Sequence, residues 1–321
     1  MVAMFSSLIR AASRRSFLIV TFSIALGLRP AAAQKSTAST AMPTFADVHY
    51  GPHERNVLDF WKADTKEPAP VVIHIHGGGF VAGDKSKIDG GTVEFFLRSG
   101  ISVASINYRY STQAPFPAPM LDGARAVQFI RSKAADWNMD PKRIAAFGGS
   151  AGAGISLWVA FHDDLAKADS ADPIERQSTR LVCAGSIAGQ SSYNPLTIRE
   201  WIGGRAWEHP ALVKLYGLSS TADFEKPENK KQFEEASAIT HLTRDDPPVV
   251  MFYNEPDEPL PADAGPDQGI HHPKFGHILK EKMDALGIEC VYRHANDGKQ
   301  PPGAVAMREF LRNHLLANTG G

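Results

Sequence analysis

The chain has 321 residues, of which 43% are hydrophobic and 21% are charged, with 34 Lys and Arg against 35 Asp and Glu. These proportions are typical of a globular domain with a sizeable core, and they exclude the collagen, coiled-coil and disordered classes. The formal net charge of -1 gives no field that would attract nucleic acid or an anionic membrane, so we expect neither as a partner. Two cysteines, Cys183 and Cys290, exclude a disulfide framework and a cysteine-rich metal site.

The first 33 residues predict an export signal. Arg14 and Arg15 precede an apolar run at residues 17–28, and three consecutive alanines follow before Gln34. A charged region, a short apolar segment and small residues, in that order, are typical of a secretory signal peptide. The run has 12 residues, fewer than the roughly 18 that a membrane-spanning helix needs, so we expect no stable membrane insertion after processing. The arginine pair resembles the twin-arginine export motif, with a Sec signal as the alternative. We therefore expect an exported protein, periplasmic or extracellular.

The remaining residues, 34–321, predict one α/β domain. Apolar runs that suit buried strands alternate with helical patterns, and such alternation predicts a mostly parallel sheet covered by helices on both faces. A helix is predicted at residues 272–287, because its apolar residues share one face and it ends at Gly287. Residues 45–50 and 56–61 predict antiparallel strands at the start of the sheet. The other predicted strands lie at residues 71–76, 101–108, 143–148, 181–187, 249–253 and 289–292.

A segment at about residues 190–246 interrupts the alternation. Its aromatic residues include Trp201, Trp207, Tyr216 and Phe224. A long segment with its own helices, inserted between two strands, is typical of a lid or cap over a site. We expect these aromatic side chains to form a wall of a pocket; the alternative is a surface decoration.

A glycine-rich motif at residues 148–152 (GGSAG) predicts a nucleophile. It stands between the predicted strand and a helical run at residues 155–165. A sharp strand-to-helix turn exposes a serine hydroxyl and places backbone N–H groups beside it, so Ser150 is the candidate nucleophile. A phosphate-binding loop is the alternative for such a turn, but no Gly-Lys-Ser/Thr follows. The glycine spacing also fails to match the dinucleotide-binding fingerprint.

A second motif, HGGGF at residues 76–80, ends another predicted strand. Three consecutive glycines are costly to order, and they make sense where backbone N–H groups must face a developing negative charge. The two motifs together predict a nucleophile and an oxyanion hole for acyl transfer. His74 and His76 share one face of the strand and could chelate a metal, but no acidic or cysteine residue lies nearby in the sequence. We expect no metal and no cofactor.

With these motifs in place, the sequence resembles the α/β-hydrolase fold, and in particular the bacterial esterases grouped with hormone-sensitive lipase and the related feruloyl and acetylxylan esterases. The resemblance covers residues 71–316 and is weakest across the inserted segment. It implies that Ser150 is the nucleophile and that Gly78, Gly79 and Ala151 supply the oxyanion-hole N–H groups. It also implies that an acid and then a histidine follow in the chain. Further matches to the family are residues 107–109 (NYR), Asp122 and residues 140–144 (DPKRI).

The acid is expected in the loop after the predicted strand at residues 249–253. This loop reads NEPDEPL and resembles the family's acid loop, with Asp257 in the position of the acid. Its role would be to orient the imidazole and to stabilise the imidazolium. Glu255, two residues earlier, is the substitute.

The histidine departs from the family's pattern. The usual His-Gly position reads DGKQ at residues 297–300. His294, between the last strand and the final helix, is therefore the expected base. His271 and His272, just after the acid loop, are the alternatives, and a degraded triad is the remaining possibility.

The leading functional hypothesis is an exported serine carboxylic-ester hydrolase that works through an acyl-enzyme without a cofactor. Ser150 would attack the ester, His294 would transfer the proton and Asp257 would hold the imidazole. The expected substrates are small-molecule or polysaccharide esters with short acyl groups or aromatic acids. The alternatives are a non-catalytic hydrolase-fold binding protein and a serine peptidase on the same fold. The sequence carries no signal for an oligomeric state.

Overall fold

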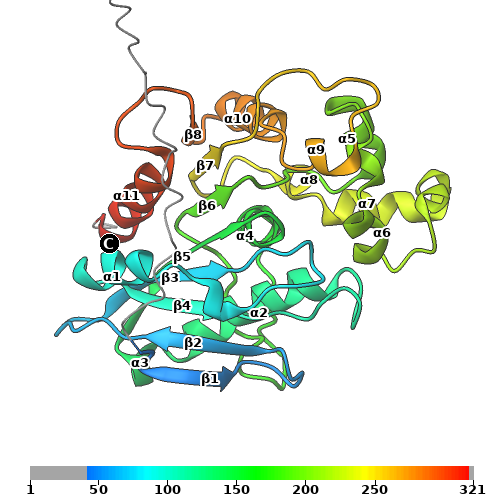
Figure 1. Ribbon diagram of the computed structural model, residues 1–321. Helices are drawn as coiled ribbons and strands as arrows, with labels where there is room; N and C mark the ends of the chain where they lie inside the picture. Colours follow the sequence, from blue (N-terminus) through cyan, green and yellow to red (C-terminus); the bar gives the residue numbers. More distant parts are fainter. Residues whose placement is uncertain (1–41, 318–321) are drawn as a thin grey trace, which may run out of the picture. The chain divides into compact units, whose positions relative to one another are not determined.

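Eight strands form one mixed sheet in the computed structural model, which describes residues 42–317 (Figure 1). Their spatial order is β1-β2-β4-β3-β5-β6-β7-β8. The first two pairings along this order are antiparallel and the other five are parallel, which confirms the predicted mostly parallel sheet with two antiparallel strands at one edge. The predicted export signal lies outside the described residues. The strands are β1 (Phe45–His49), β2 (Val57–Trp61), β3 (Ala69–Ile75), β4 (Ser102–Ile106), β5 (Met139–Gly149), β6 (Ala184–Ile187), β7 (Val249–Tyr253) and β8 (Cys290–His294).

Helices cover both faces of the sheet, as predicted, because alternate strand residues point to opposite sides. In β3, Val71 and Ile73 pack in one core, while Val72 packs in the other. The first core also contains side chains of α2, α4 and α10, and the second contains those of α1 and α11. The helices α1 and α11 lie side by side on one face of the sheet (Figure 1). The α-helices are α1 (Gly90–Arg98), α2 (Ala118–Ser132), α3 (Ala134–Trp137), α4 (Ala151–Phe161), α5 (Pro195–Trp201), α6 (Pro210–Leu215), α7 (Lys230–Ala236), α8 (Ala238–His241), α9 (Pro266–Gly269), α10 (Lys274–Leu286) and α11 (Gly303–Leu316). Short 3₁₀ helices lie at Lys85–Lys87, Ala206–Glu208, Thr221–Glu225 and Pro227–Asn229.

The helix predicted at residues 272–287 is α10, and Gly287 ends it in the left-handed conformation with φ 76°. The helix predicted at residues 155–165 is α4, which both begins and ends four residues earlier. Every residue of α4 is buried, so the helix lacks the alternation of apolar and polar residues from which its ends could be predicted. Its true start matters for function, because α4 begins directly after Ser150.

The segment between β6 and β7 contains α5 to α8 and the last three 3₁₀ helices. Tyr216 and Phe224 are buried, and each packs against Phe233, with ring centroids 4.6 Å and 5.9 Å apart. These aromatic side chains stabilise the segment from within. Among residues 42–317, no helix combines the length and the hydropathy that crossing a membrane requires.

Candidate active site

Ser150 occupies a sharp turn between β5 and α4. Its φ of 52° is unusual for a residue with a side chain, and such conformations are concentrated at functional sites. The turn depends on a close backbone approach, because a Cβ atom at Gly152 would collide with the carbonyl oxygen of Ile75 in β3. The Ser150 N–H donates to the carbonyl of Ile187 in β6, 2.9 Å away, which holds the turn against the neighbouring strand. The strand-turn-helix context predicted for this motif is therefore present.

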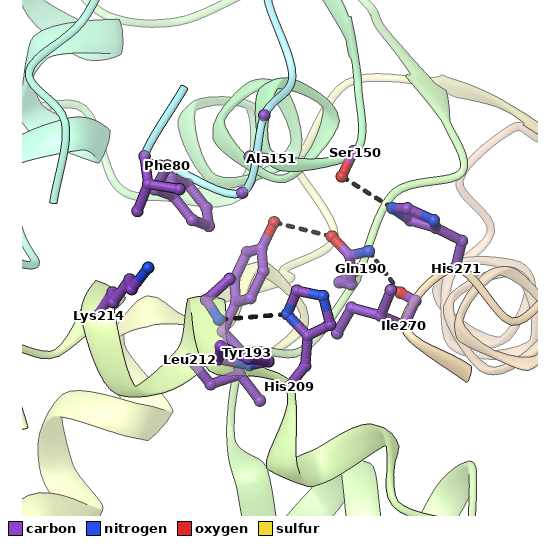
Figure 2. Close-up of a pocket in the computed structure, with 15 residues that line it drawn as sticks. Phe80, Ser150, Ala151, Gln190, Tyr193, His209, Leu212, Lys214, Ile270 and His271 are labelled. Carbon is purple, nitrogen blue, oxygen red and sulfur yellow. Dashed lines mark hydrogen bonds between the residues drawn. The ribbon is translucent and has the colours of Figure 1, made fainter. Parts of the chain in front are cut away.

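The Ser150 hydroxyl contacts His271. Its Oγ lies 2.8 Å from Nε2 of that histidine, which comes from the turn between α9 and α10 (Figure 2). A neutral imidazole with its proton on Nδ1 would accept the serine proton at Nε2. His271 is one of the two alternative bases predicted from the sequence, and its Nε2 lies within hydrogen-bond reach of the Ser150 hydroxyl, as a general base requires.

Burial lowers the pKa of His271 below the ordinary 6.5 of histidine. The charge of Glu255 acts in the opposite direction and raises this pKa, whereas nearby His209 lowers it further. The net effect keeps the imidazole neutral at neutral pH, the state in which it can accept a proton.

Two buried residues hold the turn that carries His271. Gln190 Nε2 donates to the carbonyl of Ile270, 2.5 Å away, and Gln190 Oε1 accepts from the Tyr193 hydroxyl at 3.1 Å. His272, the other alternative base, is buried and does not hydrogen-bond to Ser150. Its Nε2 lies 2.9 Å from the carbonyl oxygen of Glu258. No sequence motif marked Gln190 or Tyr193.

The loop acid whose charge acts on the His271 imidazole is Glu255, and not Asp257. Glu255 is half-buried and its charge acts on His271, although no hydrogen bond joins the two side chains. Asp257 is exposed, and its Oδ2 instead lies 2.7 Å from Nε2 of His277 on α10. The predicted contact of Asp257 with the base is therefore wrong in this structure, because two further residues of loop carry the carboxylate outward.

The predicted contact of His294 with Ser150 is also wrong. His294 Nε2 donates to the backbone carbonyl of Glu255 at 2.8 Å, and its Nδ1 accepts from Asn296 N–H at 3.2 Å. His294 is the last residue of β8, which pairs with β7, and Ser150 follows β5, three strands away, so only a longer loop after β8 could bring a histidine to the serine. At about 4.8 Å per strand this separation is roughly 14 Å. A tight turn, closed by Arg293 Nε and Asp297 Oδ2 at 2.6 Å, keeps the chain from crossing that gap.

The predicted oxyanion-hole residues line the same cavity as Ser150. Gly78 and Gly79 follow β3 with φ of 119° and 58°, and a Cβ atom at Gly78 would collide with the carbonyl of Ala82. No described residue accepts a hydrogen bond from the N–H of either glycine. Ala151 opens α4, where first-turn N–H groups lack intrahelical acceptors and the helix dipole is positive. The cavity thus offers several donors beside the serine hydroxyl.

The cavity has a volume of about 490 Å³. One wall comes from the segment between β6 and β7, but not from the four aromatic residues predicted for it. That wall consists of α6 and the residue before it, together with Tyr193, an aromatic residue earlier in the same segment (Figure 2). The complete lining is Gly78, Gly79, Phe80, Val81, Ser150, Ala151, Gln190, Tyr193, His209, Pro210, Ala211, Leu212, Lys214, Ile270 and His271.

The two histidines of the HGGGF strand have local structural partners. His74 Nδ1 lies 2.9 Å from the Ser105 hydroxyl, and the His76 ring stacks on Tyr108 with centroids 4.4 Å apart. Burial lowers the pKa of His74 to about 3 and that of His76 to about 4, so both are neutral at pH 7.

The sheet order, the strand-turn-helix at Ser150 and the flanking helices define the α/β-hydrolase fold. The BD-FAE family model matches residues 58–267, and the chain belongs to this family. The match ends before His271. The proposed base therefore lies in the part of the chain that the family model does not cover.

Two curated relatives come from Mycobacterium tuberculosis. The probable carboxylic ester hydrolase LipM is 27% identical over 67% of this chain and 48% of its own length, and the esterase LipQ is 28% identical over 68% and 50%. The chain thus spans about half the length of these relatives. A solved structure, a truncated carbohydrate esterase from gut microbiota, shares the fold with a TM-score of 0.64 and 21% identity, over 88% of this chain and 98% of that one.

Proposed function

We propose that this protein is a serine carboxylic-ester hydrolase that works through an acyl-enzyme. The observation that carries the proposal is the 2.8 Å contact between Ser150 Oγ and His271 Nε2, in a cavity lined by the N–H groups that follow β3 and open α4. The names of the curated relatives agree with this activity. The same contact disfavours the alternative of a non-catalytic binding protein, because a serine and a neutral histidine in this geometry can act as nucleophile and base.

The mechanism uses the groups in the cavity. As Ser150 Oγ attacks the ester carbonyl carbon, Nε2 of His271 takes the hydroxyl proton, and the carbonyl oxygen becomes negatively charged. The N–H groups of Gly78, Gly79 and Ala151 stabilise that oxyanion. The imidazolium, stabilised by the nearby Glu255 charge, then gives its proton to the leaving alcohol oxygen, and the acyl group stays on Ser150. Water, activated by His271, attacks this ester and releases the acid.

Short-acyl esters, such as acetates or small aromatic acyl groups on a carbohydrate, are the proposed substrates. A cavity of about 490 Å³ accommodates a short acyl group and part of an alcohol. The fold shared with a carbohydrate esterase and the export signal expected at residues 1–33 support a substrate outside the cytoplasm.

The test is covalent labelling followed by turnover. A sulfonyl fluoride should modify wild-type protein on the peptide that contains Ser150, and Ser150→Ala should block both labelling and hydrolysis of p-nitrophenyl acetate. Loss of a triad nucleophile typically costs on the order of 10⁶ in kcat. Unchanged turnover by Ser150→Ala would refute the hydrolase. A preference for acyl chains of about twelve carbons would refute the short-acyl assignment alone, and faster cleavage of peptide amides would favour the peptidase alternative.

A further inference from the structure

Three side chains outside the Ser150 cavity converge at the end of α4. They are His162, which directly follows α4, Glu235 on α7 and His241 on α8. One ring nitrogen of each histidine and one carboxylate oxygen of Glu235 all lie within 4.8 Å of one another. All three residues are half-buried. No motif in the sequence marks this cluster, because its members are separated by up to about 80 residues.

Hydrogen bonds fix which nitrogen of His162 carries its proton. Nδ1 lies 2.9 Å from the carbonyl oxygen of Asp163, which can only accept, so Nδ1 is the donor. In the neutral imidazole the lone pair is then on Nε2. That atom faces Glu235 Oε1 at 3.2 Å, so two acceptors point at each other. Such a contact is favourable only when a cation or an additional proton lies between them.

The same reasoning applies to His241. Its Nε2 lies 2.8 Å from the backbone carbonyl oxygen of Glu235, so Nε2 is the donor and Nδ1 carries the lone pair. Each histidine therefore gives one N–H to a backbone carbonyl and keeps the other nitrogen as an acceptor. This is the arrangement that orients histidine ligands around metal ions in proteins.

The contact between His162 and Glu235 has the spacing of two ligands of a tetrahedral ion. Zinc lies about 2.0–2.1 Å from nitrogen and oxygen ligands, which places two ligands at a tetrahedral angle about 3.3 Å apart. The 3.2 Å between His162 Nε2 and Glu235 Oε1 agrees with this separation. Trp158 supports the cluster, since its ring lies 4.3 Å from that of His162 and its Nε1 donates to the Glu235 carbonyl at 2.8 Å. Glu235 also lines a surface depression, which gives an ion access from solvent.

We propose that His162, Glu235 and His241 bind one Zn²⁺, with a solvent water as the fourth ligand. Imidazole and carboxylate donors suit this ion, and a water completes its coordination because Glu235 is 45% exposed. The ion joins the end of α4, the helix that begins directly after Ser150, to α7 and α8 of the segment between β6 and β7. Its role is structural, since none of the three residues lines the Ser150 cavity.

The test is zinc titration of the untagged full chain after dialysis against a chelator. Calorimetry should find one Zn²⁺ per chain, and zinc should raise the midpoint of thermal unfolding by several degrees. Glu235→Gln and His241→Gln, which keep the side-chain size, should weaken binding by at least about 100-fold. His49→Ala, an exposed histidine on β1, is the matched control and should bind as wild type does.

Two outcomes would overturn the site. One is no zinc binding by the wild-type chain, in which case a proton on His162 makes the contact with Glu235. The other is equal zinc affinity in wild type, Glu235→Gln and His241→Gln, which would place the ion elsewhere. Ser150→Ala should bind zinc with unchanged affinity, so failure of the zinc site and failure of the proposed hydrolase are distinguishable.

Discussion

Ser150 Oγ lies 2.8 Å from His271 Nε2, although 121 residues separate the two in the chain. The histidine reaches the serine from the turn between α9 and α10, in the connection that follows β7, and not from the connection that follows β8. In the proposed site the order of nucleophile, acid and histidine is kept, because Glu255 precedes His271. The proposed base comes from the loop after β7 and not from the loop after β8.

The two acids of the loop after β7 should differ in their effect on catalysis. Glu255→Gln removes the charge that stabilises the His271 imidazolium, so kcat should fall by about 10²–10⁴, the usual contribution of acid-base assistance. Asp257→Asn changes only an exposed contact with His277 and should keep kcat within about threefold, as surface ion pairs contribute little. Steady-state kinetics with p-nitrophenyl acetate compares the two. A larger loss of kcat in Asp257→Asn than in Glu255→Gln would indicate that Asp257 is the catalytic acid.

The pH dependence of kcat/KM should show an acid limb with a midpoint below 6.5. Burial lowers the pKa of His271, so the imidazole stays neutral, and active as a base, until the pH drops through that lowered pKa. Glu255→Gln should move the midpoint further down, because the carboxylate raises the pKa. His209→Gln should move it up, because protonated His209 opposes protonation of its neighbour. Shifts in the same direction for both variants would contradict this assignment.

Gln190 should act as a positioning residue for His271. Gln190→Leu removes the bond to the Ile270 carbonyl and leaves the Tyr193 hydroxyl without its acceptor. We expect kcat to fall about 10–100-fold with KM little changed, because a misplacement of about 1 Å costs roughly that much. Tyr193→Phe keeps the bond to Ile270 and should lose less. A parallel loss of kcat and thermal stability with no change in the pH profile would instead indicate a purely structural role.

The pair of Arg109 and Asp122 should contribute to stability. Asp122 is buried and accepts from the Arg109 backbone N–H and from its guanidinium, with the shortest distance 2.7 Å. Asp122→Ala should lower the free energy of unfolding by about 3 kcal/mol, the lower end for a broken buried pair, because Arg109 stays partly exposed. Asp136→Ala, which breaks the exposed pair with Lys133, should change it by less than about 1 kcal/mol. Denaturant unfolding followed by circular dichroism measures both changes. Equal changes in the two variants would contradict the claim that the buried pair contributes more to stability than the exposed pair does.

The parts of the fold that follow from local pattern were predictable. Apolar runs predicted the strands and Gly287 predicted the end of α10. The GGSAG and HGGGF motifs line one cavity in the structure, as their predicted roles require. In each case the signal lies within a few neighbouring residues, because strand burial, helix termination and tight turns are local requirements.

The position of the proposed base and the composition of the pocket wall depend on contacts between residues that are far apart in the sequence. His271 lies in an irregular turn after a four-residue helix, where no periodicity marks direction, and its place is set by Gln190, about 80 residues away. His294 is the last residue of β8, and because β8 pairs with β7, its side chain contacts the Glu255 backbone in the loop after β7. The four aromatic side chains expected in the pocket wall pack against the hydrophobic core instead. The wall is formed mainly by residues of α6.

The most direct test of the proposed base is a comparison of His271→Ala with His294→Ala, using kcat/KM for p-nitrophenyl acetate and Ser150→Ala as the reference. Residues that act as one catalytic unit lose comparable activity when removed singly. We predict that His271→Ala loses about as much activity as Ser150→Ala, and that His294→Ala, which only releases the Glu255 backbone, stays within about tenfold of wild type. Near-wild-type activity in His271→Ala with a full loss in His294→Ala would contradict the assignment of the base.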